Sequence, residues 1–288
     1  MAERALVQLT GTAGATAEPS RRQFPAPRSG WRRLDVPLTY QVLTFVAFAG
    51  VWQLYATQRG GLLMPTFTET MAALVDLLGR GEFWQAMYVS NQALFIGFAI
   101  AVSVGVPTGV MLGRFRTVER FADVYLNILL VTPMAAIIPL LIMSVGFGLA
   151  SRVILVTVFA VVLVIVSCRA GVRQIDPSLI EMARAYGATE AQVWRRILIP
   201  AALPAIMTGI RLGLGRAVTG MVLVELLMVS VALGGLILEF RGMFQGALLY
   251  ATIVAILAEA LILINIARWI ERRATPWAQT TSSPRSFQ

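Results

Sequence analysis

The sequence predicts an all-α membrane protein with about six transmembrane helices, and three observations lead to this fold class. Charged residues make up 14% of the 288 residues, whereas a soluble domain carries about 25%. Six stretches are apolar over the roughly 20 residues that a helix needs to cross the hydrocarbon. Arginines are concentrated in alternate connections between those stretches, which is typical of a chain that crosses a bilayer repeatedly.

The composition also excludes several classes of protein. All 24 basic residues are arginine, because the sequence contains neither lysine nor histidine. Without lysine the chain cannot form a P-loop for ATP, and without histidine the usual catalytic triads and His-containing zinc sites are absent. The single cysteine, Cys168, cannot form an internal disulfide. We therefore expect no catalytic residue, no metal site and no cofactor in this chain.

The expected spans are residues 37–56, 89–112, 124–146, 152–168, 205–229 and 248–267. Eighteen arginines lie on the side of the two termini and four on the other side, so the termini are expected to be cytoplasmic. Residues 1–36 and 274–288 then form polar cytoplasmic tails, the first of them basic and disordered, around a transmembrane domain at 37–273. Topology and anionic inner-leaflet lipid explain the net charge of +9 without any nucleic-acid partner.

After the first span, Thr66-x-x-Glu69 is a capping box that begins an amphipathic segment on the outer side. We expect a short helix lying on the membrane or on neighbouring spans, with a docking role as the alternative. The second span repeats small residues every four positions, which predicts close helix packing or, alternatively, a hinge. The packing glycines are Gly97, Gly105, Gly109 and Gly113. Pro107, Pro133 and Pro139 are expected to kink or unwind their helices.

The connection at about 169–204 is unusually polar. Asp176-Pro177 predicts a helix start, and Gly187 suits the left-handed residue that ends this helix. Thr189-x-x-Gln192 is a second capping box, beginning a helix that we expect to continue to Pro200. The pattern fits an interfacial hairpin, a DNA-binding helix-turn-helix or a docking element for a soluble partner. Its length and exposed mixed charge favour docking, and the flanking spans leave little room for DNA.

Polar groups within the spans are candidates for a translocation path, because ionisable residues inside a membrane are generally functional. The candidates are Thr132, Ser144, Arg211, Arg216, Thr219 and Glu225, with Glu259 in the sixth span. Alternatively, the arginines snorkel or pair with carboxylates, and the hydroxyls bond their own helices. Gly209 and Gly213 give the fifth span a shorter small-residue stripe.

The polar connection resembles the EAA loop of ABC-importer permeases, whose pattern is E-A-A-x-x-x-G, nine residues, then I-x-L-P. The sequence supplies Glu181, Ala183 and Gly187, followed after nine residues by Ile197 and Pro200. Met182 and Ile199 depart from the pattern. "DPSLIEMARAYGA", "IPAALPAIMTGIRLGLGRA" and "LGGLILEFRGMFQGALLYATIVAI" resemble the nitrate/sulfonate/taurine-type branch, over roughly residues 60–273. Ser144 and Val145 depart from the aromatic pair that this branch usually has before Gly146.

The resemblance implies a type I importer permease fold in a bacterial inner membrane. It implies that the loop is the coupling helix, where Glu181 pairs with a basic group of a separate ATPase. The small side chain of Ala183 would keep the contact surface flat, and Gly187 would make the turn between the two short helices. Arg184, Ile197 and Pro200 complete the expected coupling segment. ATP and Mg²⁺ would bind to the ATPase, and an extracytoplasmic binding protein would deliver the solute.

A second permease copy is expected to complete the path, because one chain of this size encloses little space. The branch implies a small anionic or zwitterionic solute, such as a sulfonate, taurine or nitrate. The alternatives from other classes are a stand-alone secondary transporter or channel, which more often shows internal repeats, and a membrane scaffold without transport.

Overall fold

A computed structural model describes residues 38–59, 64–227 and 232–277, and every regular element within these ranges is helical. The all-α prediction is therefore confirmed. The expected tail at 1–36 and residues 278–288 of the C-terminal tail lie outside the described residues. In chain order the elements are α1 (Leu38–Arg59), α2 (Phe67–Gly79), α3 (Gly81–Arg114), α4 (Arg116–Val131), α5 (Met134–Val145), α6 (Leu149–Arg173), α7 (Pro177–Ala185), α8 (Glu190–Val193), the π-helix η1 (Trp194–Leu198), α9 (Ile199–Leu227), α10 (Ala232–Gly242) and α11 (Gly246–Ala274).

Within the described ranges, four helical segments are long and apolar enough to cross a membrane: α3, α6, the continuous segment from α8 to α9, and α11. They contain three of the six expected spans and the fifth, 205–229, as far as residue 227, where the described range ends. A fifth results if α4 and α5 count as one broken span. Helix α1, the expected first span, is 22 residues long but is not among these segments, since Gln41 and Gln53 dilute its apolar side chains. The count of six and the side of the termini remain predictions.

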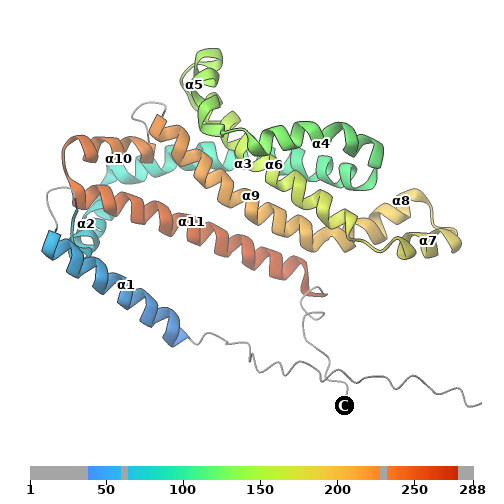
Figure 1. The fold of residues 1–288 in the computed structure, drawn as a ribbon, viewed down its shortest axis with the longest axis horizontal. Coiled ribbons are helices and arrows are strands. Elements are labelled where there is room, and N and C mark those ends of the chain that lie inside the picture. Colours follow the sequence, from blue (N-terminus) through green and yellow to red (C-terminus); the bar gives the residue numbers. More distant parts are fainter. Residues whose placement is uncertain (1–37, 60–63, 228–231, 278–288) are drawn as a thin grey trace, which may run out of the picture. The chain divides into compact units, whose positions relative to one another are not determined.

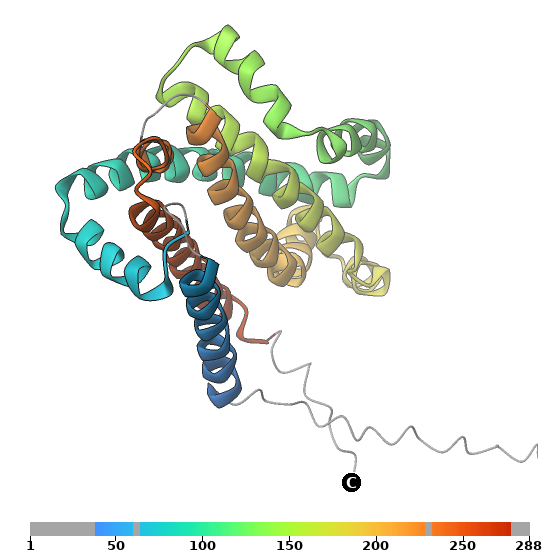
Figure 2. The ribbon, with the colours of Figure 1, turned by 60° about the vertical axis from the view of Figure 1, so that its left-hand side comes forward.

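The expected third span is broken, with an angle of 97° between α4 and α5. Thr132 ends α4, donating its backbone N–H to the carbonyl of Ile128 at 2.8 Å, and Pro133 directly precedes α5. Proline has no N–H with which to continue a helix, so the break falls where the sequence predicts one. Pro107 and Pro139, in contrast, lie inside α3 and α5 without ending either helix. Figure 2 shows α5 leaving α4 at a steep angle.

The core is formed where α6 runs beside α3 and α9, as Figure 1 shows. The glycines of α3 face α6 at very short range. A Cβ atom at Gly109 would lie 2.6 Å from the Cβ of Cys168, and one at Gly113 would lie 2.5 Å from that of Val172. Such distances are too short for two carbon atoms, so α3 approaches α6 this closely only because these residues lack side chains.

Helix α9 approaches the opposite side of α6 in the same way. A Cβ at Gly209 would lie 2.6 Å from the Cβ of Ser167, and one at Gly171 of α6 would lie 2.2 Å from that of Ala205. A hydrogen bond supports the α3–α6 contact, because the Thr157 hydroxyl donates to the Gly97 carbonyl at 3.0 Å. Two helix pairs that share α6 therefore hold the bundle together.

The helix expected before the second span is α2. Its capping box is formed as predicted: the Glu69 N–H donates to the Thr66 hydroxyl at 3.2 Å, and the Thr66 N–H donates to the Glu69 carboxylate at 2.8 Å. Leu77 of α2 is buried in a cluster with residues of α3, α10 and α11. The sequence predicts a helix that lies on the membrane or on neighbouring spans, and the structure shows α2 packed on neighbouring helices.

The structure divides into two compact units, and the boundary between them falls within α1, after Ala49. Within that first unit, the Thr44 hydroxyl donates to the Tyr40 carbonyl at 2.8 Å. Trp52 belongs to the second unit, where its indole N–H donates to the Pro65 carbonyl at 3.1 Å and its ring lies 5.8 Å from that of Tyr250. The last turns of α1 are thus held beside the start of α2 and α11.

Replacing Gly109 with alanine is expected to destabilise the fold by about 1–3 kcal/mol, because the added methyl overlaps the backbone and side chain of α6. Thermal unfolding of the purified protein in detergent measures the effect. Gly81 is a matched control in the same helix, since a Cβ there meets nothing within 4 Å. Equal melting temperatures for G109A and G81A would contradict the packing argument.

Candidate functional site

The polar connection between α6 and α9 folds as a helical hairpin whose first helix is α7. The Asp176 carboxylate accepts the Ser178 N–H at 2.9 Å, and Pro177 occupies the first turn. That backbone hydrogen bond stabilises the charged form and holds the pKa of the Asp176 carboxyl below its ordinary value. The helix start predicted at Asp176-Pro177 is confirmed.

Gly187 makes the turn between the two helices of the hairpin. Its φ of +77° is left-handed, a conformation that glycine adopts without strain. The Ala188 N–H donates to the Ala183 carbonyl at 3.0 Å, and the Gly187 N–H donates to that of Arg184 at 2.9 Å. These two bonds are the Schellman pattern that ends a helix. The predicted left-handed glycine is therefore confirmed.

The second helix of the hairpin starts as predicted but does not end at Pro200. The Thr189 N–H donates to the Gln192 side chain at 2.9 Å, and the Gln192 N–H donates back to the Thr189 hydroxyl at 3.4 Å. After α8 the chain winds as the π-helix η1 and continues into α9. Pro200 directly follows η1, where the Ile199 N–H donates to the Trp194 carbonyl five residues earlier, so the proline without an N–H falls at the wider turn. The predicted end at Pro200 is wrong, because the wider turn lets the helix pass through it.

The exposed surface of α7 combines one carboxylate with large apolar side chains. Met182 is 52% exposed and Tyr186 is 87% exposed, and Glu181 is also exposed. Among the described residues Glu181 has no ion-pair partner. Ala183 is buried, so it packs α7 onto the rest of the chain instead of lying on this surface. A free carboxylate beside exposed apolar side chains suits contact with a basic, partly apolar partner surface.

Arg184 pairs with a residue that the sequence analysis did not place in the site. Its guanidinium donates to the Glu190 carboxylate across the Gly187 turn, and Arg114 at the end of α3 reaches the same carboxylate at 3.5 Å. The Arg184 hydrogen bond lowers the pKa of Glu190, so the pair persists at neutral pH and is lost only as the pH falls through that lowered value. No spacing rule could have found this link, because Arg114 is 76 residues away.

Apolar contacts attach the base of the hairpin to the bundle. Val193 and Leu198 are almost completely buried, and Leu198 packs in a cluster with Val110 of α3 and Val172 of α6. The Trp194 ring lies 6.2 Å from that of Phe115, the residue between α3 and α4. The hairpin is therefore packed against two helices of the core as well as being continuous with α9.

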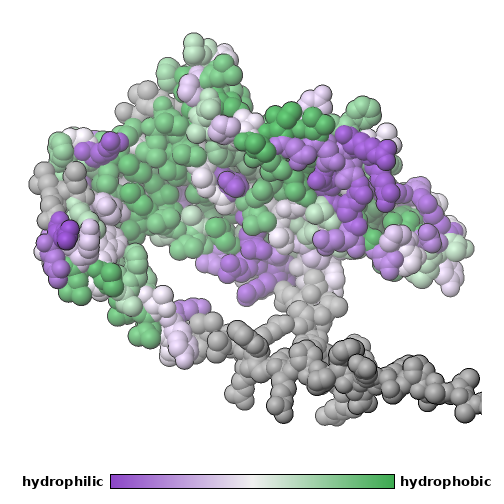
Figure 3. All heavy atoms as spheres, viewed as in Figure 1, coloured by the Kyte–Doolittle hydropathy of each residue, from purple (hydrophilic) through white to green (hydrophobic). Residues whose placement is uncertain are grey.

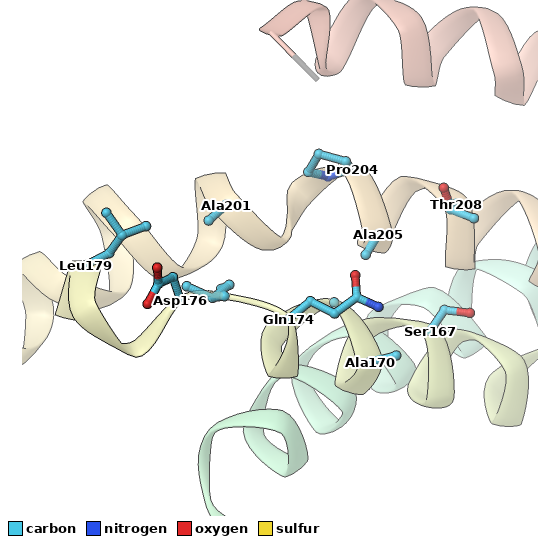
Figure 4. A pocket seen from close by; sticks show the side chains of 11 residues that line it. Ser167, Ala170, Gln174, Asp176, Leu179, Ala201, Pro204, Ala205 and Thr208 are labelled. Atoms are coloured by element: carbon cyan, nitrogen blue, oxygen red, sulfur yellow. The ribbon is translucent and has the colours of Figure 1, made fainter. Parts of the chain in front are cut away.

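A cavity of about 650 Å³ lies at the root of the hairpin, between the end of α6, the start of α7 and the first turns of α9. Figure 4 shows Gln174 and Asp176 on one side of it and Pro204 and Thr208 on the other. Because residues of α6, α7 and α9 border this space, a displacement of the hairpin relative to α6 would change its volume.

Two of the predicted path residues lie together in a smaller cavity of about 250 Å³ beside the α4–α5 break. Thr132 and Arg216 line it among mostly apolar side chains such as Phe159 and Leu223. Arg216 is exposed and belongs to none of the ion pairs within the described ranges. An unpaired guanidinium halfway along a spanning helix is costly unless it faces water or an anion.

Ser144, Arg211 and Thr219, three other predicted path residues, do not line this cavity. The hydroxyls of Thr132, Ser144 and Thr219 each donate to the carbonyl four residues earlier in their own helices. Arg211, in the middle part of α9, pairs at 2.8 Å with Glu271 in the last turn of α11. The structure thus joins Thr132 with Arg216 and does not bring Ser144 or Arg211 to the same cavity.

Glu225 is completely buried and links four helices. Its carboxylate accepts the Ser90 hydroxyl of α3 at 2.8 Å and the Gly234 N–H of α10 at 3.0 Å. Arg152 of α6 lies 3.9 Å away, and the Ser90 oxygen also accepts the Leu233 N–H at 3.2 Å. This geometry favours a structural role for Glu225, which fixes the start of α10, over direct contact with a solute.

Comparison with known proteins identifies the family. Residues 105–276 match the family described as binding-protein-dependent transport system inner membrane component. This chain belongs to that family. It is accordingly a multi-pass inner-membrane ABC permease, a transport component and not an enzyme, and ATP hydrolysis belongs to a separate ATPase subunit.

Curated permeases of three transport systems are similar to this permease over most of their length. The putative aliphatic sulfonates permease of Escherichia coli is 31% identical, over 75% of this chain and 82% of its own length. The taurine permease of Escherichia coli is 29% identical over 87% and 94%. The riboflavin permease of Chloroflexus aurantiacus is 30% identical over 90% and 97%.

The solved structures agree with the fold. The inward-facing MetNI methionine ABC transporter contains a chain that matches this permease with a TM-score of 0.59 and 21% identity, over 67% of this chain and 96% of the other. The likeness supports the type I importer permease fold that the sequence predicts.

Replacing Glu225 of this permease with leucine is expected to lower its stability by about 2–4 kcal/mol, because Ser90, Gly234 and Arg152 lose a buried acceptor. Glu225→Gln keeps an acceptor oxygen and is expected to lose clearly less. Unfolding in detergent, followed by size-exclusion chromatography on heated samples, ranks the variants. If E225L melts no lower than E225Q, Glu225 does not hold the four helices together.

Proposed function

We propose that this chain is the membrane-spanning permease of an ABC importer for a small anionic or zwitterionic solute, such as a sulfonate or taurine. In this proposal residues 169–204 are the coupling loop that a separate ATPase moves. An extracytoplasmic binding protein supplies the solute, and a second permease copy completes the path. The observation that carries the proposal is the hairpin itself, which combines a free carboxylate with a rigid attachment to α9.

The hairpin geometry supports coupling in two respects. Glu181 has no internal partner among the described residues and lies beside exposed Met182 and Tyr186, so its charge is available to a docked subunit. Behind this surface, α8, η1 and α9 form one continuous helix from Glu190 to Leu227. A push on the hairpin would therefore act directly on a spanning helix.

Arg216 and the sulfonate and taurine relatives support the choice of solute. A guanidinium binds a planar or tetrahedral oxyanion through two parallel hydrogen bonds, and the cavity beside the α4–α5 break leaves Arg216 without a carboxylate partner. The riboflavin permease is about as similar to this chain as the sulfonate and taurine permeases are. Overall similarity therefore does not select the solute, and the residues of this cavity are a better guide to it.

Reversing the charge of Glu181 is expected to reduce solute-dependent ATP hydrolysis at least about tenfold, because a docked ATPase would then face a like charge. The test uses the permease co-expressed with its ATPase and binding protein, and measures both retention of the ATPase on purification and coupled hydrolysis. Glu82→Arg is the matched control, since Glu82 is an exposed carboxylate in the first turn of α3. Gly187→Val should reproduce the loss, because a β-branched residue is strained at a φ of +77°.

If Glu181→Arg and Gly187→Val both leave uptake and coupled hydrolysis unchanged while the protein remains folded, the docking role is refuted. Uptake that continues without any ATPase would instead support the stand-alone carrier.

Replacing Arg216 with glutamine is expected to reduce taurine uptake at low concentration by about tenfold or more, which corresponds to losing one charge-assisted pair. Arg216→Lys keeps the charge but not the two-pronged geometry, and should recover part of the uptake. The assay is initial-rate uptake of labelled taurine into proteoliposomes that contain the whole transport complex. Arg120→Gln, an exposed arginine outside the cavity, is the control. A normal rate in R216Q would remove Arg216 from the path.

A further inference from the structure

A basic pocket of about 500 Å³ lies between α9 and the last turns of α11, separate from the cavity that contains Arg216. Three arginines and one glutamate provide its charge. Its lining residues are Pro204, Thr208, Arg211, Arg268, Glu271, Arg272 and Thr275. Figure 3 shows hydrophilic side chains gathered over the C-terminal part of α11, next to the apolar surface of the spanning helices.

The single carboxylate of the pocket is already fully engaged. One oxygen of Glu271 accepts the Arg211 guanidinium at 2.8 Å, and the other accepts the Thr208 hydroxyl at 3.0 Å. Arg268 and Arg272 belong to no ion pair in the described part of the chain. The pocket therefore has an excess of two positive charges, one helical turn apart on the same face of α11. An oxyanion is the ligand that would compensate them.

Aromatic side chains place this pocket at the level of the lipid headgroups. Trp269 is 57% exposed beside Arg268, and the Arg273 guanidinium lies 4.7 Å from the centroid of its ring. Trp277, also exposed, lies shortly after α11, which ends at Ala274. Exposed tryptophan next to arginine at the end of a spanning helix is typical of the membrane–water interface.

An apolar stripe leads from the pocket into the membrane. Leu257, Leu261 and Ile264 precede Arg268 at helical spacing on the same face of α11, and the two leucines are 58% and 61% exposed. A ligand that used both features would have an anionic head and a hydrocarbon tail. Arginines of this end of α11 are predicted to lie on the cytoplasmic side, whose leaflet contains the anionic lipids.

We propose that Arg268 and Arg272 bind the headgroup phosphate of an anionic phospholipid, whose acyl chain lies along Leu257, Leu261 and Ile264. The Arg211–Glu271 pair forms the back wall and keeps the carboxylate from competing for the two arginines. Inorganic phosphate could contact the same guanidinium groups, but it would not use the apolar stripe.

A lipid bound in this pocket would restrict the movement of α9 relative to α11. Pro204 and Thr208 line both the basic pocket and the cavity at the root of the hairpin, so the two spaces share one wall of α9. A headgroup held there would attach the first turns of α9 to the end of α11 and resist a change in the neighbouring cavity.

The test measures binding of phosphatidylglycerol to the purified full-length permease by native mass spectrometry and by the melting temperature in detergent. Each arginine near the surface contributes about 1 kcal/mol toward an anionic lipid. Arg268→Gln and Arg272→Gln should therefore each weaken binding about fivefold, and the double variant about 25-fold. Arg116→Gln with Arg120→Gln is the matched control, because this exposed pair on α4 has the same four-residue spacing. The control should bind like the unchanged protein.

Phosphatidylcholine and inorganic phosphate form the other two arms of the experiment. The proposal expects phosphatidylglycerol to bind and to raise the melting temperature, and neither of the other probes to do so. If inorganic phosphate alone gives the same stabilisation, the pocket binds a soluble anion and the lipid proposal is overturned. Undiminished lipid binding by the double glutamine variant overturns it as well. Should that variant fail to fold, Arg268→Lys with Arg272→Lys and the two single glutamine variants decide the same question.

Discussion

The structure depends on the close approach of α6 to two other helices, α3 and α9. Lipid provides little hydrophobic driving force between spanning helices, so tight van der Waals packing has to provide the contact. Gly109 and Gly113 supply it on one side of α6, and Gly171 and Gly209 supply it on the other. A bundle built this way is intolerant of added methyl groups at these close contacts.

The polar residues are arranged around that constraint. Glu225 is enclosed at the junction of α3, α6, α9 and α10, where one of its oxygens accepts hydrogen bonds from Ser90 and Gly234 and the other lies 3.9 Å from Arg152. Arg216, in contrast, is exposed and lines the cavity beside the break at Pro133. No carboxylate within the described ranges forms an ion pair with it. Two ionisable groups nine residues apart on one helix thus have different surroundings: Glu225 is buried among donors from other helices, whereas Arg216 is exposed and has no carboxylate partner in the described ranges.

Local chemistry could be predicted from the sequence, and long-range contacts could not. Capping boxes, the Asp176-Pro177 start and the Gly187 turn depend on neighbours within six residues, and all are present. The passage of a helix through Pro200 required a π-turn that no propensity indicates. The Arg114–Glu190 contact and the environment of Glu225 depend on which helices pack together. Sequence patterns therefore located the hairpin correctly but could not predict the contacts that surround Glu225.

Because the π-turn of η1 joins α8 to α9 in one helix, force applied to the hairpin would pass directly into α9. An ordinary helix end at Pro200 would separate the hairpin from α9 by a flexible joint, and movement of α7 would be lost there. The continuous winding from Glu190 to Leu227 instead makes α9 an extension of the hairpin. Trp194 beside Phe115, together with Glu190 beside Arg114, connects the same turn to the end of α3. Since α3 and α9 hold α6 between them, a displacement applied to the hairpin would reach both sides of the core at once.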